Sequence, residues 1–165
     1  MMNIAFKKAE SAADIALIAQ TARIIWLETY LPILGREQVE YMIEKFQSAS
    51  ALTGQLASGY VYDIIFCDGE VAGFAGYKRE NDGLFLSKLY ILKEYRGRKL
   101  ASKTVERLAE ICNKESLKYV FLTVNRQNST AIAVYTKLGF VNERSEDNEI
   151  GHGFYMNDYI MYKYI

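Results

Sequence analysis

The sequence predicts an α/β protein built around a mixed β-sheet. Segments rich in β-branched and aromatic residues alternate along the chain with segments of helical periodicity. Two of the β-rich runs meet at Asp68-Gly69, a dipeptide whose tolerance of positive φ favours a tight hairpin turn. Two further strand-like runs are each followed by a loop and a helix, so one sheet with helices packed on it accounts for every element.

The chain opens with a predicted strand and a long helix. Residues 3–8 alternate apolar and polar side chains, which is typical of a half-buried strand. Ser11 is a candidate N-cap for a helix that runs to about Tyr30, and Pro32 and Gly35 are expected to end it.

Two shorter helices and the hairpin come next. Residues 36–46 show helical periodicity, and residues 49–59 fit a further short helix. Residues 60–79 form the two strands of the hairpin, and residues 84–92 are a third long strand.

The second half of the chain alternates strands and helices. A charged loop precedes a helix over residues 100–115, and residues 119–125 have the pattern of a buried strand. A short helix from the Ser129 region ends at Gly139, and a final strand follows over residues 154–162.

Composition limits the classes of function. No repeat, low-complexity tract or linker interrupts the chain, so residues 1–165 are expected to form a single domain. The 20 basic and 20 acidic side chains cancel, so binding to nucleic acid or to an anionic membrane is not expected. No run of about 18 apolar residues predicts a membrane span.

The two cysteines predict a cytoplasmic protein without a metal site. Cys67 and Cys112 each lie in an apolar run, and neither belongs to a CxxC or Cys/His cluster that holds zinc. We interpret them as reduced core thiols. With one histidine in the chain, no ligand set for a metal is expected.

The segment Arg96–Ala101 lies between the third strand and the next helix and is rich in basic residues. A helix N-terminus leaves backbone N–H groups unpaired and carries partial positive charge, so it is suited to a phosphate or pyrophosphate. Taken alone, this segment fits a solvated basic turn equally well.

A second pattern follows the strand at residues 119–125. Its members stand at fixed offsets and are Asn128, Ala131, Tyr135, Gly139 and Phe140. Together the two segments resemble the GNAT superfamily of N-acetyltransferases, whose cofactor loop has the form Q/R-x-x-G-x-G/A and whose later motif is N-x-x-A-x-x-x-Y-x-x-x-G-F. The later motif matches at every position. In the loop Arg96 and Ala101 match, whereas Lys99 replaces the central glycine.

The resemblance implies a GNAT-type mixed, splayed central sheet flanked by helices, with acetyl-coenzyme A (acetyl-CoA) as the acetyl donor and coenzyme A as the product. The pantetheine arm would pair with the backbone of Leu89, Tyr90 and Ile91. The pyrophosphate would bind backbone N–H groups of the loop, which comprises Arg96, Gly97, Arg98, Lys99, Leu100 and Ala101.

The resemblance also implies roles for two residues of the later motif. Asn128 would contact the cofactor on its other side, and Tyr135 would protonate the departing thiolate after direct attack by the amine in a ternary complex. A phenol is suited to this task, because it can protonate a thiolate that develops in a closed site. Tyr135 also fits an ordinary core aromatic residue.

Lys99 is the main departure from the family pattern. A glycine at this position lets the backbone approach the phosphates without a Cβ, and lysine gives up that freedom. Its backbone N–H remains, and its ammonium can reach a phosphate oxygen. We therefore expect cofactor binding to survive, with altered affinity or loop mobility.

The acceptor is expected to be an amine that must lose a proton before it attacks. Many family members use a glutamate on the strand before the cofactor loop, but residues 84–92 contain no carboxylate. A water chain or one of Glu28, Asp158 and Tyr159 remains to take the proton, and each of these residues also fits a structural or surface role.

A narrower resemblance is to the bacterial branch of polyamine (spermidine/spermine) acetyltransferases. It rests on Trp26, Tyr30, Gln38, Tyr41, Met42, Phe46 and residues 149–161. His152 stands where that branch usually has asparagine, and it is either a pH-sensitive group at the acceptor mouth or a solvated turn residue. The candidate substrate-binding residues are Glu28, Tyr30, His152 and Asp158.

A polycationic acceptor calls for carboxylates near aromatic rings. An acidic cluster precedes the last strand and consists of Glu143, Glu146, Asp147 and Glu149. The alternative for this charged stretch is a soluble loop.

Two other functions stay open. The same chemistry suits a protein or peptide amine, and Lys99 with the missing carboxylate favours an acyl-CoA sensor without catalysis. The aromatic C-terminal end, which contains Tyr155, Tyr159, Tyr162 and Tyr164, fits either a homodimer face or a wall of the acceptor site.

Overall fold

A computed structural model describes residues 2–165, which divide into two compact units. Unit 1 consists of residues 2–78 and 88–101, and unit 2 consists of residues 79–87 and 102–165. Seven strands are hydrogen-bonded in the order β1-β2-β3-β4-β5-β7-β6. Both parallel and antiparallel pairs occur, so the sheet is mixed, as the sequence predicts.

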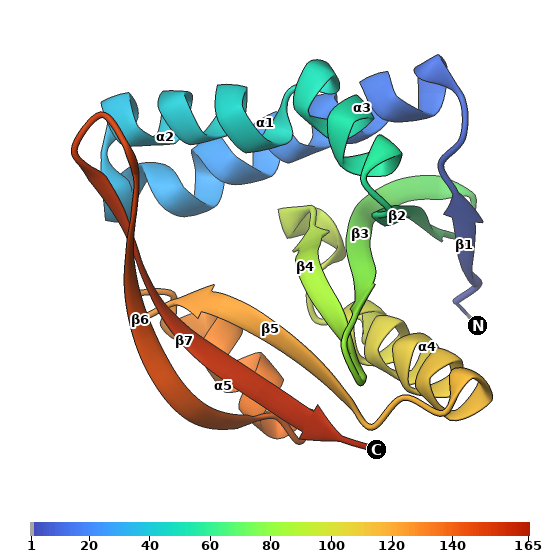
Figure 1. Ribbon diagram of the computed structural model, residues 1–165. Coiled ribbons are helices and arrows are strands. Elements are labelled where there is room, and N and C mark those ends of the chain that lie inside the picture. Colours follow the sequence, from blue (N-terminus) through green and yellow to red (C-terminus); the bar gives the residue numbers. More distant parts are fainter. Residues whose placement is uncertain (1) are drawn as a thin grey trace. The chain divides into compact units, whose positions relative to one another are not determined.

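Unit 1 holds three helices and the first strands of that order (Figure 1). Its strands are β1 (Ile4–Lys8), β2 (Val61–Cys67), most of β3 (Glu70–Glu80) and the second half of β4 (Gly83–Ile91). Its helices are α1 (Ala12–Leu34), α2 (Arg36–Met42) and α3 (Ala49–Ala57), with a π-helical turn η1 (Ile43–Gln47) and a 3-10 turn η2 (Lys93–Tyr95). The helices lie over one face of these strands (Figure 1), and the buried core between them includes Ile18, Ala22, Leu52, Tyr62, Ile64 and Phe74.

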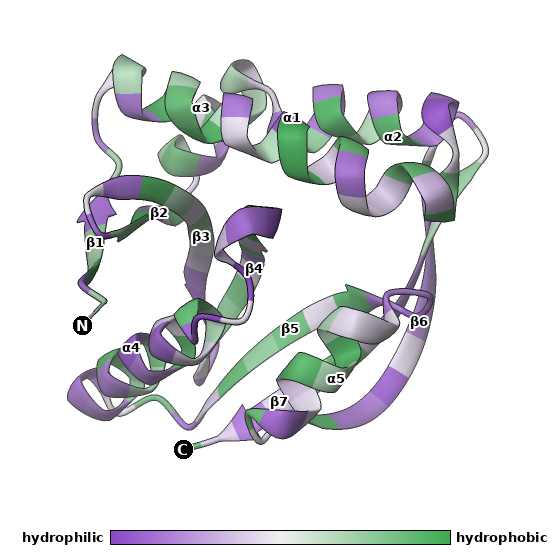
Figure 2. Cartoon of the chain, turned by 180° about the vertical axis from the view of Figure 1, so that it is seen from behind, coloured by the Kyte–Doolittle hydropathy of each residue, from purple (hydrophilic) through white to green (hydrophobic). Residues whose placement is uncertain are grey.

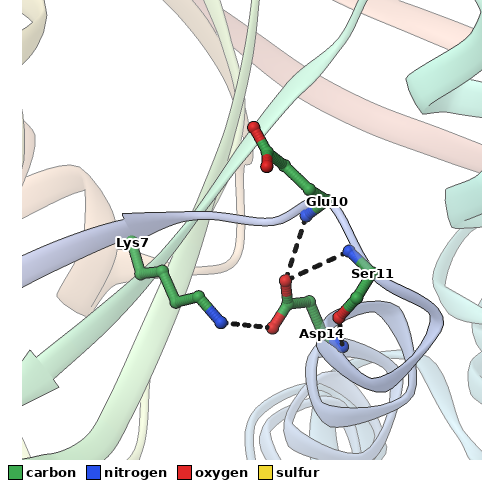
Figure 3. A network of polar contacts seen from close by, with 4 residues as sticks. All are labelled: Lys7, Glu10, Ser11 and Asp14. Atoms are coloured by element: carbon green, nitrogen blue, oxygen red, sulfur yellow. Dashed lines mark hydrogen bonds and ion pairs between the residues drawn. The ribbon is translucent and has the colours of Figure 1, made fainter.

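The start of α1 is fixed by a capping box, which confirms Ser11 as the N-cap (Figure 3). Ser11 Oγ accepts a hydrogen bond from the Asp14 N–H at 3.1 Å, and the Asp14 carboxylate accepts from the backbone N–H groups of Glu10 and Ser11. Lys7 of β1 donates to the same carboxylate at 2.9 Å. The bond from Glu10, then those from Lys7 and Ser11, hold the pKa of Asp14 well below its usual range.

The end of α1 differs from the prediction that Pro32 and Gly35 break the helix together. Pro32 lies inside the last turn, and the helix continues to Leu34. Proline has no backbone N–H, so the carbonyl of Glu28 loses its helical donor, but this loss does not end the helix. Gly35 alone ends the helix: its φ is +83°, and its N–H bonds to Leu31 O at 3.1 Å.

The helix predicted over residues 36–46 is divided into α2 and the π-helical turn η1. The turn is tied to β4 by Lys88, whose Nζ donates to Phe46 O and, at 3.1 Å, to Gln55 Oε1 of α3. Lys88 is only 6% exposed, and burial lowers its pKa to about 7. A charged side chain in the middle of a strand thus points into unit 1.

The hairpin between β2 and β3 is confirmed. Asp68 and Gly69 have φ values of 52° and 83°, which is the left-handed pair that a type I′ turn requires.

Unit 2 contains the first half of β4, most of α4 (Leu100–Glu115), β5 (Tyr119–Asn125), α5 (Ser129–Lys137), β6 (Val141–Gly151) and β7 (Phe154–Tyr164). β4 pairs with β5 in parallel from Gly83 to Phe85, and β5 pairs with β7 along its whole length. The strand over residues 119–125 and the helices after residues 99 and 128 are therefore confirmed.

The sequence prediction misses β6. The acid-rich residues 141–151 form an edge strand paired with β7, and not a loop. Figure 2 shows β6 mainly in purple, whereas β5 is mainly green. Edge strands commonly carry charges, which discourage pairing with another chain, so β6 lacks the apolar alternation on which strand prediction relies.

Candidate functional site

The β4 segment predicted to hold the pantetheine arm is the edge of unit 1. Within this unit the strands run β1-β2-β3-β4, and the Leu92 N–H just after β4 bonds to Ala72 O of β3 at 2.8 Å. Leu89, Tyr90 and Ile91 are half-buried. The described part of unit 1 places no strand against the other edge of this segment, so that edge suits pairing with an extended ligand.

Tyr30 and Tyr90, which were predicted for different roles, belong to one aromatic group in unit 1. The Trp26 ring lies 4.2 Å from that of Tyr30 and 6.1 Å from that of Tyr90, and Tyr90 also meets Phe74 edge-on at 5.5 Å. Glu28 is exposed on the same helix as Tyr30. Tyr30 is therefore connected to Tyr90 of β4 through the Trp26 ring, whereas Glu28 is a surface residue.

The loop before α4 has an alternating backbone conformation. Gly97 and Lys99 have φ values of 76° and 64°, and α4 begins at Leu100. Alternation of left-handed and ordinary residues turns successive N–H groups into a concavity that binds anions. Lys99 thus adopts the left-handed conformation that glycine, the usual residue of the family at this position, adopts easily. For a residue with a Cβ this conformation costs about 1–2 kcal/mol.

Arg96 has a structural contact that its motif position does not suggest. Its Nε donates to Ile91 O at 3.1 Å, and its Nη2 donates to Thr29 Oγ1 at 3.2 Å. The guanidinium therefore links α1 to the end of β4. The Arg98 guanidinium lies 5.2 Å from the centre of the Tyr95 ring, while Lys99 is exposed.

These residues fit a pyrophosphate. A Cβ built on Gly97 would meet no atom within 4 Å, so the loop surface there is open. The first turn of α4 contains no acidic residue, and the helix is 16 residues long. Left-handed turns, a helix N-terminus and exposed basic side chains are the features that bind phosphate groups.

Asn128 and Tyr135 lie on α5 of unit 2. Asn128 is the N-cap of this helix, and its Oδ1 accepts from the Ala131 N–H at 3.1 Å. Tyr135 is half-buried, with its ring edge-on to Phe140 at 5.5 Å. The motif residues therefore also define the ends of α5. Asn128 caps its start, and Gly139, with a φ of +96°, follows its end.

Asp158 and Tyr159 point to opposite faces of β7, because side chains alternate along a strand. Lys163, on the Tyr159 side, donates from Nζ to Leu138 O just after α5 at 2.8 Å, so Tyr159 shares the α5 face. Asp158 lies on the other face and is 5% exposed. Burial raises its pKa to about 6, with Arg126 opposing the rise and Glu146 adding to it.

His152 is part of the turn between β6 and β7. Gly151 pairs with Phe154, so His152 and Gly153 form a two-residue turn, and their φ values are 52° and 74°. Asparagine and histidine are among the residues that tolerate this left-handed conformation, which accounts for their exchange at this position. The His152 side chain is exposed.

The acidic residues predicted as one cluster are divided between the faces of β6. Glu146 pairs with Asp158 and shares its face, whereas Asp147 and Glu149 pair with Asn157 and Tyr155 on the α5 face. In a loop these carboxylates could lie close together. In a strand, successive side chains point to opposite faces of the sheet, so the carboxylates are separated.

Sequence reasoning missed two residues that shape the β4 region. Gly73 of β3 lies so close to β4 that a Cβ would stand 2.2 Å from Tyr90 O. A glycine inside a strand-like run is the signal that could have found it. Nothing in the sequence signals that Lys88 is buried, since its acceptors come from residues 46 and 55, far along the chain.

The residues that the structure describes contain no group of three or more histidine, cysteine, aspartate and glutamate side chains arranged to hold a metal ion. Over residues 2–165, no helix has both the length and the apolar character needed to cross a membrane.

Comparisons with known proteins point to one family. The sequence profile of the acetyltransferase (GNAT) family matches residues 19–140. A spermidine N(1)-acetyltransferase from Thermoplasma acidophilum is 29% identical over 153 residues, which cover 90% of this chain and 94% of that protein.

Two solved structures share the fold. The PaiA N-acetyltransferase from Thermoplasma acidophilum, crystallised with coenzyme A, has a TM-score of 0.81 and 26% identity over 99% of both chains. The ribosomal-protein-S18-alanine N-acetyltransferase from Escherichia coli has a TM-score of 0.70 and 20% identity, covering 99% of this chain and 94% of the other. The predicted fold class is confirmed.

Proposed function

Because the chain belongs to the acetyltransferase (GNAT) family, it is an N-acetyltransferase, and we propose that its acceptor is a small cationic amine of the polyamine class. The observation that carries the proposal is the 29% identity to a spermidine N(1)-acetyltransferase over 90% of the chain. The two units would then act as one domain, and that domain would span residues 1–165.

Acetyl-CoA supplies the acetyl group as an activated thioester. We assign the backbone edge of Leu89, Tyr90 and Ile91 to its pantetheine arm and the loop from Arg96 to Ala101 to its pyrophosphate. The fit of the loop supports this, because Gly97 and Lys99 have positive φ beside the N-terminus of α4. Asn128 is proposed as a further cofactor contact.

Tyr135 is the proposed proton donor to the sulfur that leaves. The acceptor amine attacks the carbonyl carbon, the carbon–sulfur bond breaks, and the Tyr135 hydroxyl passes its proton to the thiolate. General acid catalysis of this kind contributes about 100-fold or more to the rate. Cys67 and Cys112 are free and buried, which supports the reducing cytoplasm as the site of action.

The test is the release of free thiol from acetyl-CoA in the presence of a panel of amines, among them spermidine and a peptide with a free N-terminus. We expect spermidine to be the better acceptor, and Tyr135→Phe to lower kcat about 100-fold with little change in the KM of acetyl-CoA. Phenylalanine has nearly the same size and shape as tyrosine, so Tyr135→Phe tests the role of the hydroxyl alone.

Other results would contradict the proposal. Faster turnover of the peptide than of spermidine would assign the protein to peptide or protein acetylation. Binding of acetyl-CoA without thiol release for any amine would instead assign it to acyl-CoA sensing.

A further inference from the structure

Asp158 lies on a face of unit 2 that combines negative charge with aromatic rings. Its cross-strand neighbours are Asn125 of β5 and Glu146 of β6, and directly paired residues share a face of the sheet. By the same alternation, the rings of Phe121 and Tyr162 are on this face.

The aromatic face, defined here as Phe85, Tyr119, Phe121, Tyr162 and Tyr164, is a continuous set of ring contacts. Phe85 stacks on Phe121 at 4.9 Å, and Phe121 stacks on Tyr162 at 5.5 Å. Tyr119 meets Tyr162 edge-on at 5.3 Å, and Tyr162 stacks on Tyr164 at 5.9 Å. Ring faces attract organic cations, so this surface suits the methylene chain and charges of a polyamine.

Charge pairing leaves Asp158 unmatched. Glu146 pairs with Arg144 at 3.3 Å, and Asp147 pairs with Arg126. Among residues 2–165, no cation lies within ion-pair distance of Asp158, and no hydrogen bond reaches its carboxylate. A carboxyl group that is 5% exposed and lacks a partner is rare, because burial without compensation is costly.

We propose that Asp158 binds one ammonium group of the acceptor and that the aromatic face holds the rest of the chain of that acceptor. An ammonium supplies the positive charge and the hydrogen-bond donors that this carboxylate lacks. The assignment rests on the proposed function, which it deepens by naming the residue that selects a cationic acceptor.

The test compares the binding of spermidine by calorimetry, and the KM of spermidine, in the wild type and in Asp158→Asn. We expect Asp158→Asn to weaken binding and to raise this KM about tenfold or more, with the KM of acetyl-CoA unchanged. Glu149→Gln is the matched control, because it removes the same charge from the same hairpin on the opposite face. Its affinity for spermidine should equal that of the wild type.

The pH dependence provides a second measurement on the unmutated protein. The ion pair needs an ionised carboxylate, so spermidine binding should weaken as the pH falls through about 6. The charged groups that act on Asp158 come from the residue after β5 (Arg126) and from β6, where Glu146 and Arg144 share its face.

The outcomes separate the two proposals. Thiol release that no amine stimulates in the wild type would overturn the proposed function. If the wild type acetylates spermidine and Asp158→Asn does so with the same KM and pH profile, the role of Asp158 is wrong. If Asp158→Asn fails to fold, two measurements decide together. Asp158→Glu keeps the charge and should retain spermidine binding, and binding by the wild type should weaken at low pH.

Discussion

At the scale of single residues, Lys99 has the least favourable backbone conformation in the loop from Arg96 to Ala101, which we propose as the cofactor loop. Its φ of 64° is left-handed. The other described non-glycine residues with positive φ are Asp68, Asn81, Ser116 and His152. Asparagine, aspartate and histidine tolerate this geometry better than lysine does, so backbone strain is expected to be greater at Lys99 than at Asp68, Asn81 and His152.

Lys99→Gly should therefore stabilise the protein. Relief of about 1–2 kcal/mol of backbone strain is offset by the greater freedom of glycine in the unfolded chain, about 0.5–1 kcal/mol, which leaves a gain of up to about 1.5 kcal/mol. Urea denaturation measures it. Lys99→Ala is the control, because it keeps the Cβ and the strain; equal stability of the two variants would show that the backbone is not strained there.

Lys88 predicts a pH-dependent stability. Its pKa is about 7 in the folded protein and about 10.4 in an unfolded chain. Between these values the unfolded chain binds one more proton, so the contribution of Lys88 to the free energy of unfolding rises with pH. Below pH 7 Lys88 is protonated in both the folded and the unfolded chain, so the free energy of unfolding is lowered by the full cost of burying its charge.

Urea denaturation of the wild type and Lys88→Met between pH 7 and 9 measures this dependence. We expect the wild type to gain about 1 kcal/mol per pH unit relative to the variant. The loss of hydrogen bonds to Phe46 O and Gln55 shifts the variant by a constant amount, so only the slope counts. Parallel curves would mean that Lys88 keeps an ordinary pKa.

At the scale of elements, the approach of β3 to β4 depends on Gly73. A Cβ at this position would lie 2.2 Å from Tyr90 O and 3.0 Å from Ile91 Cα, and backbone atoms cannot give way as a flexible side chain can. The same β4 residues form the edge proposed for pantetheine. The close spacing of β3 and β4 therefore depends on the absence of a Cβ at Gly73.

Gly73→Ala should lower the free energy of unfolding by about 2 kcal/mol or more and raise the KM of acetyl-CoA, because β4 must shift. Gly54→Ala is the matched control: Gly54 lies within α3 with nothing within 4 Å of its added Cβ, and alanine should stabilise that helix by up to about 1 kcal/mol. Equal effects of both changes in urea denaturation would contradict the close approach.

The elements with clear periodicity were predictable, and β6 was not. Residues 119–125 alternate buried and more exposed side chains and were found without error in their bounds. Residues 141–151 lie at an edge, are mostly exposed and are stabilised by backbone pairing with β7, which leaves no pattern in the side chains. Because β6 was not predicted, the sequence named Asp158 as a candidate but did not place it opposite Glu146.

At the scale of the whole molecule, three elements run through both units. β3 contributes residues 70–78 to unit 1 and residues 79–80 to unit 2, and β4 contributes residues 83–87 to unit 2 and residues 88–91 to unit 1. The helix α4 begins in unit 1 and continues in unit 2. Neither unit can unfold without disrupting a strand or helix that it shares with the other unit. We therefore predict that residues 1–165 unfold as one cooperative domain.

Hydrogen exchange at increasing urea concentration tests this. The slowest amides of β2, in unit 1, and of β5, in unit 2, should reach the same free energy of opening. A lower value for one strand throughout the titration would mean that the units unfold separately.

The family was readable from residues 96–101 and 128–140, because such motifs encode local backbone geometry. The role of residues 96–101 in binding the cofactor stays a prediction. The partners of Lys88 and the unmatched charge of Asp158 were not readable, since each depends on segments distant in the sequence. Spacing along a chain fixes neighbours on a helix or in a turn, but not neighbours across a sheet.

Trp26 gives the protein a built-in optical reporter. It is the single tryptophan of the chain, is 3% exposed, and its indole Nε1 has no hydrogen-bond partner among the described residues. Its ring touches Tyr30 and Tyr90, and Tyr90 belongs to the strand edge proposed for the cofactor. A ligand that binds to that edge changes the environment of Trp26. The affinity for acetyl-CoA can therefore be measured by intrinsic tryptophan fluorescence, without a label and without a contribution from another tryptophan.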